Sequence, residues 1–303
     1  MDKKITLDHN PEVFSRIASL KIHTTKLVEG LLSGHHRSHH KGSSVEFADY
    51  KDYSPGDETK HIDWKVVGKT DKYQIKQFEQ STNLKATILL DASGSMGYES
   101  VNPKAIKKMD YARTLVAALS YLFLKQSDSV GLYLFNDIIT TPVPARSKPT
   151  HFKHILHELV MLTPQGATKL ESAIDSLAKQ LFGRGIIILV SDLLTKETEV
   201  EKKLNLLATR GMEVIIFHIL DSDEVSLPFE GDIIFESLED DSSIGLNPID
   251  IKETYQREIQ KKIKHYRSHC SSLGIDYVFL ETSTPLEQGL TYYLSRRKNL
   301  GKR

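Results

Sequence analysis

Short apolar runs without polar alternation constrain this chain most strongly. Residues 86–90 and 185–190 are two such runs. Strands that helices cover on both faces have this pattern, whereas a half-exposed strand alternates apolar and polar residues. Residues 131–135, 214–220 and 275–280 are further strand candidates. The sequence therefore predicts several buried strands of one sheet.

The segments between these strands show the periodicity of helices. Apolar residues recur at three- and four-residue steps over residues 105–123 and 170–181, which indicates amphipathic helices. Asn247 and Pro248 supply an N-cap and a first-turn proline for a helix that should stop at Gly274. Strands that alternate with helices predict an α/β fold with a Rossmann-like, doubly wound, mostly parallel sheet.

The first 82 residues differ from the rest of the chain. A helical pattern runs to Leu32, and polar, turn-rich sequence follows from Gly34 to Asp71. We therefore divide the chain into an N-terminal helical and polar segment, residues 1–82, and an α/β domain, residues 83–303.

Overall charge and cysteine content narrow the classes of partner and location. Lys and Arg number 40, as do Asp and Glu, so the net charge favours neither nucleic acid nor an anionic membrane surface as the main partner. Cys270 is the one cysteine, which excludes an internal disulfide. The sequence shows no signal-peptide pattern and no apolar run of the ~20 residues that a spanning helix needs. We expect a cytoplasmic protein without direct membrane insertion.

Five oxygen-bearing residues are predicted to meet at the carboxyl edge of the sheet. Asp91, Ser93 and Ser95 follow the first buried strand, Asp192 follows another, and Thr168 ends the loop before a helix. Mg²⁺ is a hard, octahedral ion that prefers oxygen ligands and retains some water. The sequence therefore predicts a Mg²⁺ site, for which Mn²⁺ and Ca²⁺ are alternatives. We expect Asp91 to lie at the surface end of its strand.

Each of these residues also has a purely structural explanation. Ser93 and Ser95 are suited to cap the next helix, and Asp192 is suited to a turn. Thr168 with Glu171 forms a possible capping box. The combination on three loops favours the metal site over these explanations.

The pattern Asp91-x-Ser93-x-Ser95 with the distant Thr168 and Asp192 resembles the metal-ion-dependent adhesion site of von Willebrand factor A domains. The resemblance covers about residues 84–303. It implies that the ion has an open coordination position, which the acidic side chain of a protein partner fills. The implied role is metal-dependent protein–protein interaction rather than catalysis.

Four short motifs lie just upstream, at residues 33–38, 42–47, 53–57 and 61–64. They resemble the hallmark of the DUF58 family of bacterial proteins. In that family a block of short motifs precedes such a metal-site domain. Lys51, Lys60 and Lys69 stand where arginine is expected. The resemblance implies a MoxR-type AAA+ ATPase as partner, because family members are often encoded beside one.

Two enzyme motifs are approximated but incomplete. Residues 67–70 (Val-Gly-Lys-Thr) end like a phosphate-binding loop, but Asp63 replaces its first glycine, so we expect no ATP hydrolysis. Residues 93–97 differ from a nucleophile elbow at the first position. The alternative function is therefore a serine hydrolase with Ser95 as nucleophile, Asp192 as acid, and a histidine base, either His218 or His265.

Four histidines in the polar segment suggest a transition-metal site, because imidazole is a common ligand. Their neighbours Arg37 and Lys41 and the absence of nearby cysteine favour a solvated basic loop instead. The four are His35, His36, His39 and His40.

Overall fold

A computed structural model of the chain separates it into two compact units. The large unit consists of Met1–Gly34 and Leu84–Arg303, and the small unit is His35–Asn83. The residues that the structure describes are 11–34, 46–53, 62–70, 72–79, 84–103, 105–137, 139–168, 170, 172–175, 185–195, 197–209 and 211–300.

The large unit is built around a six-stranded sheet in the order β10-β7-β6-β3-β4-β5. All neighbouring pairs are parallel except β4 with β5, which are antiparallel. Pro142 and Pro144 lie on β5, where an edge strand tolerates the missing N–H donor. The predicted α/β fold with a doubly wound, mostly parallel sheet is confirmed. The strands are β3 (Lys85–Asp91), β4 (Ser129–Phe135), β5 (Ile139–Arg146), β6 (Ile186–Ser191), β7 (Glu213–Leu220) and β10 (Asp276–Glu281).

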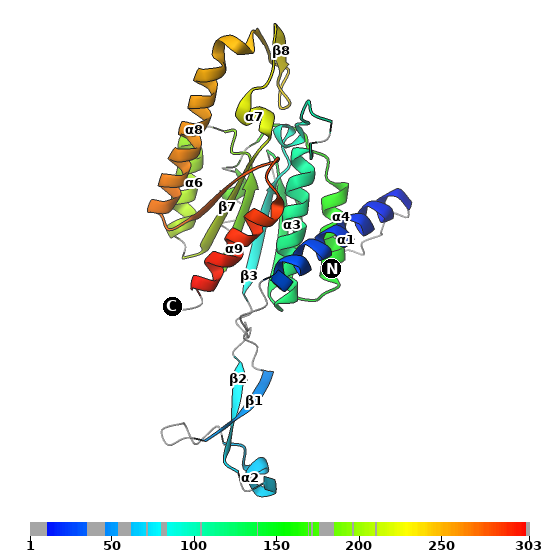
Figure 1. The fold of residues 1–303 in the computed structure, drawn as a ribbon, viewed down its shortest axis with the longest axis vertical. Coiled ribbons are helices and arrows are strands. Elements are labelled where there is room, and N and C mark those ends of the chain that lie inside the picture. Colours follow the sequence, from blue (N-terminus) through cyan, green and yellow to red (C-terminus); the bar gives the residue numbers. More distant parts are fainter. Residues whose placement is uncertain are drawn as a thin grey trace. The chain divides into compact units, whose positions relative to one another are not determined.

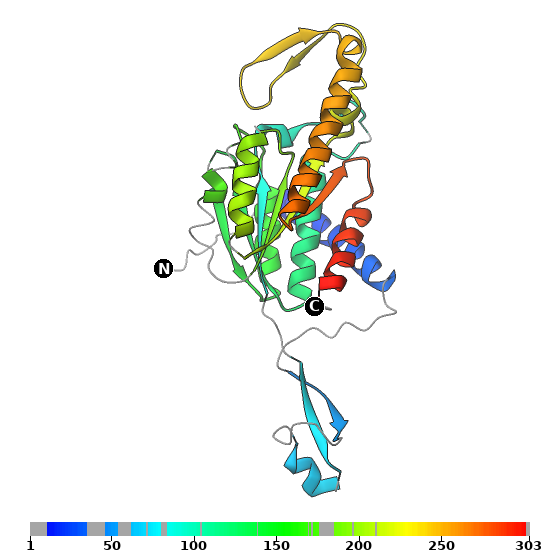
Figure 2. The ribbon, with the colours of Figure 1, turned by 90° about the vertical axis from the view of Figure 1, so that its left-hand side faces the viewer.

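Helices cover both faces of this sheet (Figures 1 and 2). Along β3, Ile88 and Leu90 pack into the core on one face, and Leu89 packs into the core on the other. This two-sided burial explains the continuous apolar runs in the sequence. The first face carries α1 (Pro11–Gly34), α3 (Lys108–Lys125), α4 (His151–Met161) and α9 (Leu286–Leu300), and the second carries α6 (Glu197–Thr209) and α8 (Pro248–Ser272).

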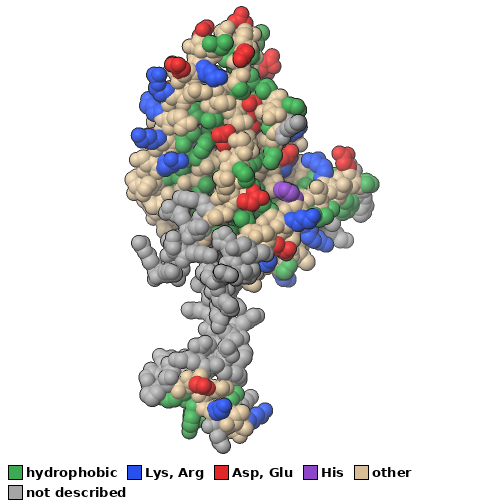
Figure 3. All heavy atoms as spheres, in the orientation of Figure 1, with side chains coloured by type: hydrophobic (Ala, Val, Ile, Leu, Met, Phe, Trp, Pro, Cys, Tyr) green, Lys and Arg blue, Asp and Glu red, His purple; other side chains and the backbone are tan. Residues whose placement is uncertain are grey.

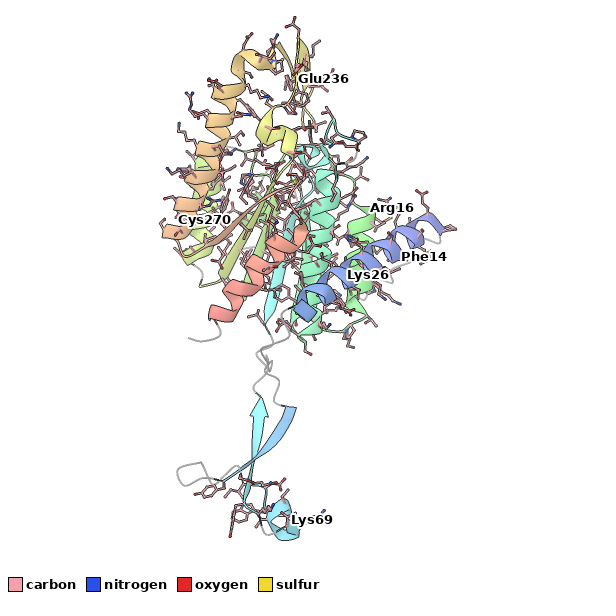
Figure 4. All side chains as sticks on the ribbon, in the orientation of Figure 1. Phe14, Arg16, Lys26, Lys69, Glu236 and Cys270 are labelled. Atoms are coloured by element: carbon pink, nitrogen blue, oxygen red, sulfur yellow. The ribbon has the colours of Figure 1, made fainter. Side chains whose placement is uncertain are left out.

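Helix α8 begins and ends where the capping residues of the sequence predict. The Asn247 side chain accepts a hydrogen bond from the backbone N–H of Ile249 (3.1 Å), and Gly274 beyond the helix has φ +70°. Cys270 lies on this helix and is buried (Figure 4). Helix α3 differs in extent from the sequence pattern. Helix α3 begins at Lys108, and of residues 170–181 only 170 and 172–175 are described, as helix.

Helix α1 belongs to the large unit, although the sequence analysis grouped it with the N-terminal segment. Val28 is fully buried, and Ile17, Leu20 and Leu27 are partly buried in the same core as α3 and α4. The apolar face of α1 thus completes the covering of the sheet. No helix in the described part of the chain is long and apolar enough to cross a membrane.

The small unit contains an antiparallel pair, β1 (Glu46–Asp52) with β2 (Gln74–Glu79), and helix α2 (Trp64–Thr70). Residues 67–70 lie in α2, so the sequence that approximates a phosphate-binding loop is helical here. Lys69 is on this helix (Figure 4). The histidines His35, His36, His39 and His40 and much of the motif block lie outside the described residues.

The strand order reverses at β3, which fixes where a ligand can bind. β3 pairs with β4 on one side and with β6 on the other. In open α/β sheets, ligands bind beyond the carboxyl ends of the strands at such a reversal. Asp91 ends β3, and Asp192 follows β6 directly. The short helices η2 (Gly94–Gly97) and α7 (Ser222–Ser226) and the hairpin of β8 (Ile233–Glu236) with β9 (Ser243–Leu246) complete the large unit.

Candidate metal centre

Backbone hydrogen bonds join two of the loops at the carboxyl edge. The N–H of Gly94 donates to the carbonyl oxygen of Gly166 (2.8 Å), and the N–H of Gln165 donates to that of Ala92 (2.9 Å). The loop after β3 and the loop that carries Thr168 are therefore fixed against each other. The third loop, after β6, is tied to β3 by a side-chain bond from Ser191 to Asp91.

The two serines present their hydroxyl groups to the same point. Ser93 Oγ and Ser95 Oγ are 3.1 Å apart. Two adjacent corners of an octahedron with ligands at about 2.0–2.1 Å are about 2.9 Å apart, so both oxygens can bind one Mg²⁺ with little movement. Ser93 precedes η2 but makes no capping hydrogen bond, so capping does not explain it.

Asp91 is fully buried, and the expectation that it lies at the surface end of its strand is wrong. Its Oδ1 accepts from the backbone N–H of Ser93 (3.0 Å), and its Oδ2 accepts from Ser191 Oγ (2.7 Å). The loops that fold over the end of β3 exclude solvent from it. Burial, together with the negative charge of Asp192, raises the pKa of Asp91 to about 7. A bound cation would relieve this repulsion.

Asp192 forms an ion pair inside the protein with Lys108 of α3. Lys108 Nζ lies 2.8 Å from Asp192 Oδ2 and 2.7 Å from Glu224 Oε1, and the lysine side chain is completely buried. Burial alone would lower the pKa of Lys108, but the two carboxylates outweigh it and raise the pKa. The pKa of Asp192 is lowered, since the nearby ammonium outweighs the effect of burial. Lys108 and Asp192 therefore keep their charges, whereas burial raises the pKa of Glu224.

Lys108, Glu224 and Ser191 were not predicted from the sequence as members of this site. Lys108 precedes Tyr111 and Ala112 by three and four residues, so it lies on the apolar stripe of α3. A lysine on a buried stripe at the sheet's carboxyl edge is a signal that could have revealed it. No such signal in the sequence pointed to Glu224.

The backbone beside Asp192 is held in an uncommon conformation. Leu193 is fully buried and has φ +50°, in the left-handed region that residues other than glycine rarely adopt. Two side chains support this turn, because the N–H of Leu193 donates to Ser191 Oγ (3.0 Å) and that of Leu194 donates to Asp192 Oδ1 (3.2 Å). The turn role that the sequence allowed for Asp192 is therefore present, together with its ion pair.

Thr168 is bonded to a carboxylate that the sequence analysis did not foresee. Its Oγ1 donates to Glu239 Oε1 (3.0 Å), and its backbone N–H donates to Glu239 Oε2 (3.2 Å). Glu239 belongs to the tip of the β8–β9 hairpin. Glu171, the other half of the possible capping box, lies outside the described residues.

The charges and donors at this edge fit one hard divalent cation. Asp91, Asp192 and Glu224 carry three carboxylates against the single ammonium of Lys108, so two negative charges stay uncompensated when all four groups are ionised. No group of three His, Cys, Asp or Glu suited to a metal occurs among the described residues. Besides carboxylates, the ion would therefore also need hydroxyl groups and water as ligands, which Mg²⁺ accepts.

The geometry required for the serine hydrolase alternative is not present. Ser95 hydrogen bonds with Ser93 and with Asp192, and no described histidine bonds to it. His218 lies within β7, where its Nδ1 contacts the hydroxyl of Tyr277 (2.6 Å), and burial lowers its pKa to about 3. His265 on α8 pairs with Glu201. Neither imidazole is positioned to take a proton from Ser95.

Comparisons with known proteins give one family and several distant relatives. The family described as "Protein of unknown function DUF58" matches residues 49–267. An uncharacterized protein of Mycobacterium tuberculosis is 26% identical over 234 residues, which cover 76% of this chain and 72% of the relative.

Solved structures with a similar fold include BatB from Bacteroides thetaiotaomicron and the VWA domain of Rpn10. BatB is 17% identical with a TM-score of 0.47, over 71% of this chain and 99% of BatB. The Rpn10 domain is 15% identical with a TM-score of 0.41, over 69% of this chain and 94% of that domain.

Proposed function

The chain belongs to the DUF58 family, and we propose that it is a divalent-metal-dependent protein–protein interaction module. The ion, Mg²⁺ or alternatively Mn²⁺ or Ca²⁺, is held at the carboxyl edge of the sheet by Asp91, Ser93, Ser95, Thr168 and Asp192. An acidic side chain of the partner completes its coordination. This mode of binding is the one that the resemblance to von Willebrand factor A domains implies.

The observation that carries the proposal is the charge imbalance among buried side chains. Asp91 and Asp192 are both fully buried, yet one lysine serves Asp192 and Glu224 together. Burying an uncompensated carboxylate is costly, so such an arrangement requires a cation or a proton. The hydroxyl groups of Ser93 and Ser95 beside it favour a hard metal ion.

Exposed apolar side chains beside the edge support a protein partner. Leu194, two residues after Asp192, is 42% exposed, and Leu238, whose carbonyl oxygen lies against Gly94, is 53% exposed. Val101, in the segment between η2 and α3, is 65% exposed. Protein interfaces commonly place apolar contacts around a few strongly bound groups. The ion would supply the strong contact and these residues the surrounding area.

The proposed partner is a MoxR-type AAA+ ATPase, with which the chain would act in the assembly or maturation of other proteins. Because the proposed contact runs through the ion, removing the ion should abolish binding. The purified ATPase should be retained by the tagged chain in Mg²⁺ and lost in EDTA. It should also be lost in Mg²⁺ when the chain carries Ser93→Ala and Ser95→Ala.

The double variant is the decisive arm, because EDTA also strips Mg²⁺ from the ATPase. A matched control is Ser15→Ala with Ser271→Ala, two exposed serines on α1 and α8. Circular dichroism should show both variants folded. Equal recovery of the ATPase by wild type, double variant and control would refute metal-mediated binding.

A further inference from the structure

The tip of the β8–β9 hairpin, residues 237–242, lies directly against the candidate metal centre. A Cβ atom added at Gly94 would come within 1.9 Å of the carbonyl oxygen of Leu238. One residue further, Glu239 binds both Oγ1 and the backbone N–H of Thr168. Figure 1 shows β8 next to α7 at the carboxyl end of the sheet, and Figure 4 labels Glu236 at the end of that strand.

Glu239 is held in place by a built turn. The N–H of Ser237 donates to the carbonyl oxygen of Ser242 (2.9 Å), which closes the hairpin tip. Ser237 Oγ accepts from the N–H groups of Glu239 and Asp240, each at 3.2 Å. Asp240 Oδ1 accepts from the N–H of Ser242 (3.0 Å). The backbone on both sides of Glu239 is thus fixed while its carboxylate reaches Thr168.

The position of Glu239 suits a ligand of the same ion. Its Oε1 is 3.0 Å from Thr168 Oγ1, close to the roughly 2.9 Å between adjacent corners of a Mg²⁺ octahedron. A threonine hydroxyl has one hydrogen and two lone pairs, so it can donate to Glu239 and still bind the ion. Ser93 and Ser95 show nearly the same spacing, at 3.1 Å.

We propose that Glu239 is an internal acidic ligand of the ion, so that the hairpin tip closes the metal centre until a partner's carboxylate displaces it. The inference rests on the proposed function and adds its regulation. The chain's own acid occupies the place that the partner's acid needs. Only a partner that contacts more than the ion, for instance the exposed Ile234 and Leu238, gains enough to displace the tip. Figure 3 shows acidic and apolar side chains together at this end of the visible face.

The test measures the metal alone, on the full chain. Mg²⁺ affinity is measured by calorimetry, and the number of waters on bound Mn²⁺ by water-proton relaxation. Glu239→Gln should weaken Mg²⁺ binding about 10-fold or more and add one water to bound Mn²⁺, because the amide is a poorer ligand than the carboxylate. The matched control is Asp241→Asn, which removes the same charge from an exposed position of the same tip and should change neither value.

Hydrogen exchange provides a second readout. Mg²⁺ should slow exchange of the amides of residues 237–242 in wild type and in Asp241→Asn, but not in Glu239→Gln. Equal Mg²⁺ affinity and equal hydration in wild type and Glu239→Gln would overturn the inference and leave the metal-dependent function standing. Loss of affinity in Asp241→Asn as large as in Glu239→Gln would also overturn it, since charge alone would then explain the effect. A wild-type chain that binds no metal would refute both.

Discussion

The buried polar side chains of the large unit include two groups that differ in charge. At the carboxyl ends of β3 and β6, Lys108 lies between Asp192 and Glu224, and the ion pair of Lys108 with Asp192 remains ionised. Between β7 and β10, His218 contacts the hydroxyl of Tyr277 among aromatic rings. Burial lowers the pKa of His218 to about 3, which keeps the ring neutral at physiological pH.

The difference shows that burial removes a charge unless an opposite charge is in direct contact. Asp192 exerts some attraction on His218, but burial outweighs it. Lys108 keeps its charge because two carboxylates lie within 2.9 Å of its Nζ. Of these two groups, only the edge group has more carboxyl groups than ammonium groups and can therefore hold a cation. Three predictions test this contrast.

The largest expected effect is on the edge group. Lys108→Met should lower the free energy of unfolding by about 3–5 kcal/mol, because it leaves Asp192 and Glu224 buried without their counter-ion. Chemical denaturation in EDTA measures this. The matched control is Lys107→Met, since Lys107 pairs with Glu99 at the exposed surface and should contribute only about 0–1 kcal/mol. Similar losses in the two variants would show that the buried pair has no special role.

A smaller effect, visible only in acid, is expected for the neutral group. With a folded-state pKa of about 3 and an unfolded value of about 6.5, His218 takes up a proton only on unfolding in this range. Its contribution should therefore lower stability as the pH falls from about 6.5 towards 3, by at most about 1.4 kcal/mol per pH unit. His218→Asn, which keeps a hydrogen-bonding group near Tyr277, should remove this contribution.

Unfolding experiments at several pH values in EDTA give the comparison. The exposed His23→Asn is the control and should keep the wild-type pH dependence. If His218→Asn lost stability in acid as steeply as wild type, the buried ring would not be neutral as described.

The last prediction is that no change occurs, because Ser95 should not react as a nucleophile. A fluorophosphonate probe should not label Ser95, because its described partners are Ser93 and Asp192 and no described imidazole contacts it. Mass spectrometry of the labelled protein measures this. Stoichiometric labelling at Ser95 would instead establish a nucleophilic serine and revive the hydrolase alternative.

The sequence revealed those parts of the fold and site that depend on local pattern. The strand ends and the spacing of Asp91, Ser93 and Ser95 follow from burial and periodicity along the chain. Contacts between distant segments could not be read in this way. Glu239 meets Thr168 across 71 residues, and Lys108 meets Glu224 across 116, through the packing of whole elements.

The edge strand β5 and the packing partners of α1 could not be predicted from the sequence either. β5 was missed because Pro142 and Pro144 argue against a strand, although both are compatible with an edge. The sequence showed that α1 is amphipathic, but the surface that its apolar face covers became evident only from the core with α3 and α4.

The most direct test of the metal-dependent account is a calorimetric Mg²⁺ titration of wild type and Asp91→Asn. Asparagine preserves the volume of the buried side chain and removes its charge, so the metal-free variant should stay folded by circular dichroism. We predict that wild type binds one Mg²⁺ per chain and that Asp91→Asn binds none detectably. Equal Mg²⁺ affinity in the two proteins, or no binding by wild type, would contradict the account.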